Sequence, residues 1–277
     1  MKIIFSSARN NKWLDDLIEL GATSFLFSFE DRSVIKQVKY LSTKYSDRKF
    51  LILIDSGAFS VFSRGMKLDL DLYSDFIEKV KAVKTPHEIY FINVDIIPQA
   101  KGTTPTKDEI ERACEQGLEN YIKLKQRGHN TLHTFHQFDN FKYLDIIREE
   151  CDTENYICIS PANDQSLESR YYWLQEVTRQ VKTTTRTHCL GLTAVNVLED
   201  LPVFSADSST WRAGARYGMV FDWENFSMLK KDAISPTNCL FYDPTNHCSD
   251  ATRYHLNIER HLTNVWDKRG VSWPEKQ

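Results

Sequence analysis

Three aspartates follow short apolar runs, and carboxylates in that position can do chemistry. Asp55 comes after LILI, Asp95 after FINV and Asp207 after VFSA. A carboxylate at the end of a buried strand is costly unless it is hydrogen-bonded, paired or used. Two carboxylates on either side of a glycosidic bond can serve as nucleophile and as general acid and base. A third can accept hydrogen bonds from an N–H-rich base edge such as that of guanine.

Each of these residues also has an ordinary explanation. An aspartate directly after a strand is commonly a helix N-cap or a turn residue, and Asp55-Ser56-Gly57 alone would fit a tight turn. His133 and His136 would likewise be ordinary polar residues in or beside a strand. Three aspartates at three strand ends favour a shared site if the strands belong to one barrel.

The elements that must position the aspartates alternate between apolar runs and amphipathic helical patterns. Eight runs are predicted as strands, and several are apolar throughout, as in strands buried on both faces. They are Ile3–Phe5, Ser24–Phe27, Phe50–Ile54, Ile89–Val94, Thr131–Phe135, Tyr156–Ile159, Thr187–Leu190 and Val203–Ser205. Among the helical patterns, one begins with a capping box at Thr106 and Glu109 and should end at Gly128.

This alternation predicts a single (β/α)8 barrel of the TIM type in the 277 residues. We expect one domain over residues 1–277, with the barrel core at about 1–220 and a C-terminal helical extension at 221–277 packed on it. A doubly wound open sheet is the competing architecture, but no G-x-G-x-x-G motif follows the first strand. In a barrel, the active site lies at the carboxyl ends of the strands.

The composition is that of an ordinary globular protein, with 41% hydrophobic and 26% charged residues. No apolar run approaches the roughly 18 residues of a membrane span, and MKIIFSSARNNKW turns polar too early for a signal peptide. Six cysteines without C-x-x-C spacing indicate a reducing compartment, so we expect a cytoplasmic protein with no membrane partner. A net charge of −3 argues against bulk electrostatic binding of nucleic acid but leaves room for a local basic groove.

The order of the motifs resembles that of the tRNA-guanine transglycosylases. The segment Asp55-Ser56-Gly57-Ala58-Phe59 is similar to the D-S-G-G-[FY] element of that family. Asp207, with Arg216 and Gly218 behind it, is similar to the family's D-x8-R-x-G nucleophile segment. The full set most resembles the phage-type DNA 7-deazaguanine transglycosylases (the DpdA group), which put 7-deazaguanine bases into DNA. The resemblance rests on DSGAFS, NVDIIP, TFHQFD, YICISPAND, HCLGLT and FSADSSTWRAGARYG, between about residues 50 and 220.

The resemblance implies base exchange through a covalent glycosyl–aspartate. Asp207 would attack C1′ of a deoxyguanosine, and Asp55 would protonate the leaving guanine or deprotonate the incoming 7-deazaguanine. Phe59 would stack on the base. The expected base-binding residues are Ser56, Gly57, Phe59, Asp95, Gln137, Ser160, His188 and Gly191. Base exchange conserves bond energy, so we expect no redox or nucleotide cofactor.

The expected partners are DNA, with tRNA as the alternative, and a free 7-deazaguanine base. Extruding a nucleotide from a duplex calls for positive charge around the rim. The expected contacts are Arg212, Arg216, Lys230, Lys231 and Arg253, although a solvated helix of mixed charge is the competing interpretation for the last of them. We expect a monomer or homodimer, located in the host cytoplasm if the chain is encoded by a bacteriophage.

The sequence departs from the tRNA enzymes at the zinc site. It has no C-x-C-x2-C…H spacing, and its only similar cluster is Cys239, His247 and Cys248, for which we favour a loop with a free thiol over zinc. Ala58 replaces the second glycine of D-S-G-G, and Ser208 replaces the cysteine after the nucleophile. The missing zinc region favours DNA over tRNA.

Three alternatives stay open at this point. The first is the same exchange on tRNA or another RNA. The second is a barrel that binds nucleic acid or a free deazapurine without catalysis. The third is a glycoside hydrolase, because paired carboxylates on a barrel are common among those enzymes.

Overall fold

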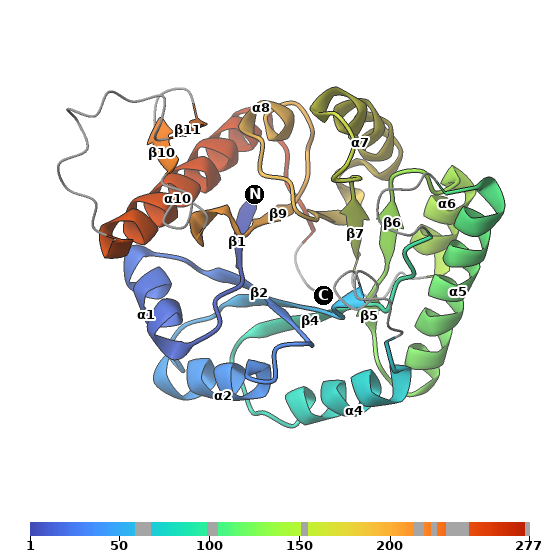
Figure 1. Ribbon diagram of the computed structural model, residues 1–277, viewed down its shortest axis with the longest axis horizontal. Coiled ribbons are helices and arrows are strands. Elements are labelled where there is room, and N and C mark those ends of the chain that lie inside the picture. Colours follow the sequence, from blue (N-terminus) through green and yellow to red (C-terminus); the bar gives the residue numbers. More distant parts are fainter. Residues whose placement is uncertain are drawn as a thin grey trace.

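The chain folds into an α/β barrel of the TIM type, as the alternation of elements predicts. In the described part of this computed structural model, nine parallel strands form a nearly closed barrel inside a ring of helices (Figure 1). The strands are β1 (Lys2–Ser6), β2 (Ser24–Ser28), β3 (Leu51–Asp55), β4 (Glu88–Ile92), β5 (Thr131–Leu132), β6 (Thr134–His136), β7 (Tyr156–Ser160), β8 (Arg186–Cys189) and β9 (Ser205–Ser208). The structure describes residues 1–58, 68–98, 105–150, 155–212, 219–222, 226–230 and 244–274.

The fifth predicted strand, Thr131–Phe135, is split in two at His133. Its first part, β5, pairs with β4, and its second part, β6, pairs with β7. The carbonyl of His133 accepts a hydrogen bond of 2.8 Å from the N–H of Cys158, so the hydrogen bonding continues past the break. The eight predicted runs therefore make nine strands, and the two halves of one run close the barrel.

The last strand lies further along the chain than the apolar pattern predicts. That pattern favours Val203–Ser205, whereas β9 spans Ser205–Ser208. The register comes from β1, where residues 2–5 pair with residues 205–208. Pairing with β1, and not hydrophobicity, therefore decides where β9 begins and ends, and this pairing places Asp207 within the strand.

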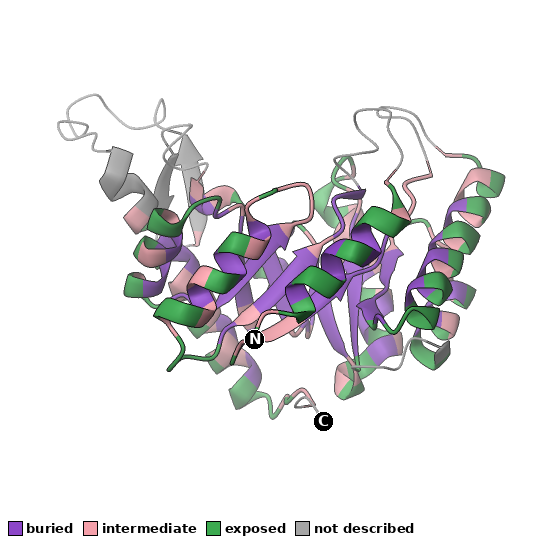
Figure 2. Ribbon diagram, turned by 90° about the horizontal axis from the view of Figure 1, so that it is seen from below, coloured by how far each residue is buried: buried purple, intermediate pink, exposed green. Residues whose placement is uncertain are grey.

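The helices cover the outside of the barrel and bury one face each (Figure 2). They are α1 (Asn11–Leu20), α2 (Val34–Lys44), α4 (Leu70–Lys81), α5 (Lys107–Gln126), α6 (Phe141–Glu150), α7 (Leu167–Val181), α8 (Val195–Leu198) and α10 (Pro244–Lys268). The predicted capping box is confirmed at the start of α5: the Thr106 side chain accepts from the N–H of Glu109, and the Glu109 side chain accepts from the N–H of Thr106. None of the helices in the described ranges combines the length and apolar character needed to cross a membrane.

The C-terminal helix α10 packs on the barrel beside β1, between α1 and α8 (Figure 1). Its buried face carries Ala251, Tyr254, Ile258 and Leu262, at the helical spacing expected of a core-facing stripe. A short antiparallel pair, β10 (Met219–Asp222) and β11 (Ser227–Lys230), precedes it.

The barrel interior is filled by side chains, and its two ends differ. Residues such as Ile4, Leu53 and Tyr156 form a small buried cluster inside the strands. At the amino end of the strands, the Arg186 side chain donates a hydrogen bond of 2.6 Å to the carbonyl of Pro274, so the C-terminal segment covers that end. The carboxyl end is where the three aspartates lie.

Candidate active site

The structure brings Asp55, Asp95 and Asp207 together at the carboxyl end of the barrel. Asp55 ends β3, Asp95 follows β4 and Asp207 lies in β9. Burial raises the pKa of Asp55 to about 7, and the negative charges of Asp95 and Asp207 add to that shift. Burial raises the pKa of the Cys158 thiol inside the barrel, and the negative charges of Asp55, Asp95 and Asp207 raise it further. The three carboxylates therefore share one electrostatic environment, as their positions after apolar runs predict.

Asp55 and Asp207 line one cavity of about 690 Å³, which opens between the loops after β1 and β2. The main chain around them supplies donors. The N–H groups of Gly57 and Ser56 point at the Asp55 carboxylate and oppose the rise in its pKa. Ser56 is fully buried, and its hydroxyl has no hydrogen-bond partner among the described residues. The cavity thus has two carboxylates at its base and polar main-chain groups beside them.

Asp207 is held from two sides. The N–H of Gly191 donates a hydrogen bond of 2.7 Å to its Oδ1 atom, and the Ser6 hydroxyl donates another. Burial nevertheless raises the pKa of Asp207 to about 6. Gly191 has φ 67°, the left-handed region that favours glycine, so the turn after β8 presents its N–H to this carboxylate. Gly191 therefore binds the Asp207 carboxylate directly. Its predicted role in binding the base stays a prediction.

His188 lies behind Asp207, inside the barrel wall. Its side chain is fully buried, and its Nε2 atom is 3.7 Å from Asp207 Oδ1. Its Nδ1 atom is 2.9 Å from the Ser205 hydroxyl, which is 2.6 Å from that of Tyr156. Burial lowers the pKa of His188 to about 3, so the ring is neutral. This position favours a supporting role for His188 over the predicted contact with a base.

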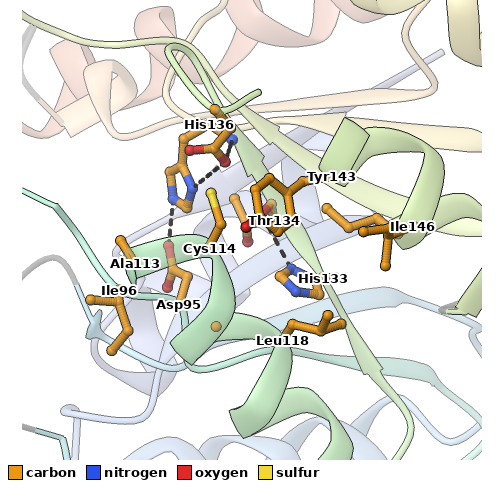
Figure 3. A pocket seen from close by; sticks show the side chains of 13 residues that line it. Asp95, Ile96, Ala113, Cys114, Leu118, His133, Thr134, His136, Tyr143 and Ile146 are labelled. Atoms are coloured by element: carbon orange, nitrogen blue, oxygen red, sulfur yellow. Dashed lines mark hydrogen bonds and ion pairs between the residues drawn. The ribbon is translucent and has the colours of Figure 1, made fainter. Parts of the chain in front are cut away.

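His136 is a site residue that sequence reasoning missed. Its Nε2 atom is 2.7 Å from Asp95 Oδ2 (Figure 3), and its Nδ1 atom is 3.4 Å from Asp139 Oδ2. Burial alone would lower the pKa of His136, but its bonds to Asp139 and Asp95 raise it to about 10. The signal was an aspartate three residues after a strand-end histidine. His133, by contrast, stacks on Tyr121, and burial lowers its pKa to about 4, as fits an interior histidine.

Gln137 contacts both the loop after β7 and the first turn of α7. Its side-chain oxygen accepts a hydrogen bond of 2.9 Å from the N–H of Ala162, and its amide nitrogen donates one of 3.1 Å to the Ser169 hydroxyl. Its own N–H donates to the carbonyl of Ser160 at 2.9 Å. Both ends of the Gln137 amide are thus used within the chain, and the base-binding roles of Gln137 and Ser160 stay predictions.

The described cations differ from those expected at the rim. Arg212 lies over the ring of Trp13 at 4.2 Å and donates to the carbonyl of Ser7 at 3.1 Å, and Arg253 pairs with Asp250 on the outer surface of α10. The cavity that holds Asp55 and Asp207 is instead lined by Arg9 and Arg32, both exposed. They follow the first and second strands, so their position at the start of βα loops was the sequence signal.

Several predicted residues lie outside the part of the chain that the structure describes. These are Phe59, Arg216, Lys231 and Cys239, together with the side chains of Lys230, His247 and Cys248. Among the described residues, no group of three or more His, Cys, Asp or Glu side chains could hold a metal ion.

Gly57 is required by its conformation and by its neighbours. It has φ 78°, and a Cβ atom there would lie 2.7 Å from Glu30 Cγ and 3.2 Å from Ser28 Oγ. Gly128 has φ 81° with nothing within 4 Å of such a Cβ, so it shares the backbone strain without the crowding.

We expect Gly57→Ala to lower the free energy of unfolding by about 2–3 kcal/mol, and Gly128→Ala by only about 1–2 kcal/mol, because the latter costs left-handed strain alone. Urea unfolding of both variants measures the difference. Equal losses in the two variants would contradict a close approach at Gly57.

Comparison with known proteins adds no assignment to this site: no protein-family model matches the chain, and no curated protein matches its sequence.

Proposed function

We propose that this chain is a base-exchange transglycosylase that replaces guanine in DNA with a 7-deazaguanine. The observation that carries the proposal is the pair Asp55 and Asp207, which lie in one cavity at the carboxyl end of the barrel with their pKa values raised to about 7 and about 6. Neighbouring carboxylates with separated pKa values can divide the roles of nucleophile and general acid between them. The motif order described above supplies the base and the polymer.

In this proposal Asp207 is the nucleophile. Its ionised carboxylate attacks C1′ of the target nucleotide, and the bond from C1′ to N9 of guanine breaks. The N–H of Gly191 and the Ser6 hydroxyl hold the Asp207 carboxylate in one orientation for that attack. The product of this first half-reaction is a glycosyl ester on Asp207.

Asp55 moves the protons. Its carboxyl group gives a proton to the leaving guanine, and the resulting carboxylate takes one from the incoming 7-deazaguanine. The deprotonated base then attacks C1′ and releases Asp207 as a carboxylate. Atoms and charge balance over the cycle, and the enzyme ends as it began.

The test of the proposal is transfer of labelled guanine into duplex DNA, single-stranded DNA and tRNA by the purified chain. Label in DNA is the expected result. Label in tRNA alone would keep the reaction and replace the polymer, while a failure to label any of the three polymers would contradict base exchange by this chain.

Arg9 and Arg32 are the described cations best placed to meet a phosphodiester backbone. Both line the cavity of Asp55 and Asp207, and neither forms an ion pair with another described residue. A polynucleotide bent toward the two aspartates would pass these guanidinium groups, which suit phosphate geometry.

We expect the double substitution Arg9→Gln and Arg32→Gln to weaken DNA binding and to make the slope of log K against log salt shallower by about two, one per lost phosphate contact. Arg253→Gln is the comparison, since that guanidinium pairs with Asp250 away from the cavity. Fluorescence anisotropy at several salt concentrations measures both. If the slope of log K against log salt changed in Arg253→Gln and not in the double variant, the DNA would contact α10 and not the cavity arginines.

A further inference from the structure

His136 joins two carboxylates that come from different parts of the rim. Asp95 follows β4, and Asp139 lies in the turn after β6. The Asp139 carboxylate also accepts a hydrogen bond of 2.8 Å from the N–H of His136, and Cys114 of α5 lies within hydrogen-bond reach of it. Figure 3 shows the imidazole directed at Asp95 beside a small cavity of about 20 Å³. Both ring nitrogens therefore face acceptors.

Nε2 has a carboxylate oxygen at 2.7 Å and Nδ1 has one at 3.4 Å, and two carboxylates around one buried imidazole favour its charged imidazolium form. The other titratable groups that face it carry no charge. Burial raises the pKa of the Cys114 thiol, and burial lowers the pKa of His133 to about 4. The positive charge of His136 is therefore shared by Asp95 and Asp139, whose side chains are only 14% and 8% exposed.

This pairing distinguishes Asp95 from the two aspartates of the reaction. Asp55 and Asp207 accept hydrogen bonds from neutral main-chain N–H groups, whereas Asp95 is bound to a cation. The contact with His136 occupies one oxygen, Oδ2. Within the described ranges, no hydrogen bond to the other oxygen, Oδ1, accompanies this contact.

We propose that His136 is a positioning residue that holds Asp95 as an oriented anion, so that Asp95 selects bases whose edge carries N–H donors, the 2-amino-6-oxopurines. This inference rests on the proposed function and on the expected contact of Asp95 with the guanine edge, and it adds the residue that orients the Asp95 carboxylate. A carboxylate accepts from both the N1–H and the 2-amino group of guanine. Hypoxanthine lacks the 2-amino donor, and adenine presents an acceptor at N1.

The variants that test this are His136→Gln and Asp139→Asn, with His129→Gln as the matched control. His129 is also a histidine beside a carboxylate, with its Nδ1 atom 3.2 Å from Glu78 Oε1, but it precedes β5 at the opposite end of the barrel. We expect His136→Gln to raise KM for guanine about 10- to 100-fold, the range for losing a hydrogen bond to a charged group, with kcat changed much less. Its preference for guanine over hypoxanthine should fall, Asp139→Asn should lie between it and wild type, and His129→Gln should match wild type.

A folded His136→Gln protein with the wild-type KM and the wild-type base preference would overturn the proposal. NMR titration of labelled histidine tests the pairing of His136 with Asp95 and Asp139 independently of activity. We expect the His136 resonance to titrate well above pH 6.5 in wild type and at lower pH in Asp95→Asn, and an ordinary titration in wild type would also overturn the proposal.

If wild type exchanges no base, the proposed function fails by itself. Equilibrium binding of guanine and hypoxanthine to wild type and His136→Gln then decides the inference: a loss of guanine binding in the variant supports it, and equal binding contradicts it.

Discussion

Replacement of Asp207 by asparagine is expected to lower the rate of base exchange by a factor on the order of 10⁴ or more, because the amide cannot form the glycosyl ester. Asparagine has nearly the same shape as aspartate, and its side-chain oxygen can still accept the hydrogen bond from the N–H of Gly191. Wild type incubated with DNA while free guanine is removed should accumulate a protein–DNA adduct that survives denaturation, and the variant should give none. Label transfer and denaturing gels measure the two effects.

The control for this experiment is Asp145→Asn on the exposed surface of α6, which should retain wild-type exchange. The Asp207→Asn protein should also be folded. The pKa of Asp207 is raised on folding, so the native state binds more protons than the unfolded chain, and this group lowers stability as pH rises through about 4 to 6. Removing that carboxylate should therefore leave the variant at least as stable as wild type at pH 7.5. Full exchange activity in a folded Asp207→Asn protein would rule out this nucleophile.

Asp55→Asn is expected to slow exchange by about 10²- to 10⁴-fold, the contribution of a positioned general acid and base. It should still form some adduct with a substrate whose leaving base needs no proton, because Asp207 is intact. The comparison of a normal and an activated leaving base in single-turnover kinetics measures this. A loss that is equal for the two substrates would contradict proton transfer by Asp55.

The carboxyl groups of Asp55 and Asp207 should together set how the exchange rate depends on pH. Exchange requires Asp207 ionised and Asp55 protonated, so the rate should rise as pH increases through about 6 and fall above about 7. These apparent values belong to the coupled pair and not to either residue alone. The Asp55→Asn variant should lose the fall at high pH and keep the rise, because asparagine does not titrate.

Local sequence signals predicted the scaffold and the three aspartates. Apolar runs such as LILI are buried strands, and the capping box of Thr106 and Glu109 begins α5 as expected. Strand ends meet at one rim in a parallel barrel, so residue types at the ends of runs were enough to bring Asp55, Asp95 and Asp207 together. Both patterns depend on neighbours close in the chain, which a sequence displays directly.

The tertiary structure alone decided what supports each carboxylate. The β9 register depends on pairing with β1, which lies about 200 residues away, and so the position of Asp207 within the strand could not be read from VFSA. The ion pair of His136 with Asp95 joins two rim segments 41 residues apart, and both side chains are mostly shielded from water, which strengthens the pair.

The basic residues show the same division. The sequence by itself determined a barrel with three rim carboxylates. Beyond their position after the first two strands, nothing in the sequence sets Arg9 and Arg32 apart from other surface arginines, and only the fold places them on the cavity of Asp55 and Asp207. Arg212 lies over the ring of Trp13 instead. Burial, charge pairing and hydrogen-bond partners arise from contacts between distant segments, and only those contacts set which of the polar residues are supports and which face a substrate.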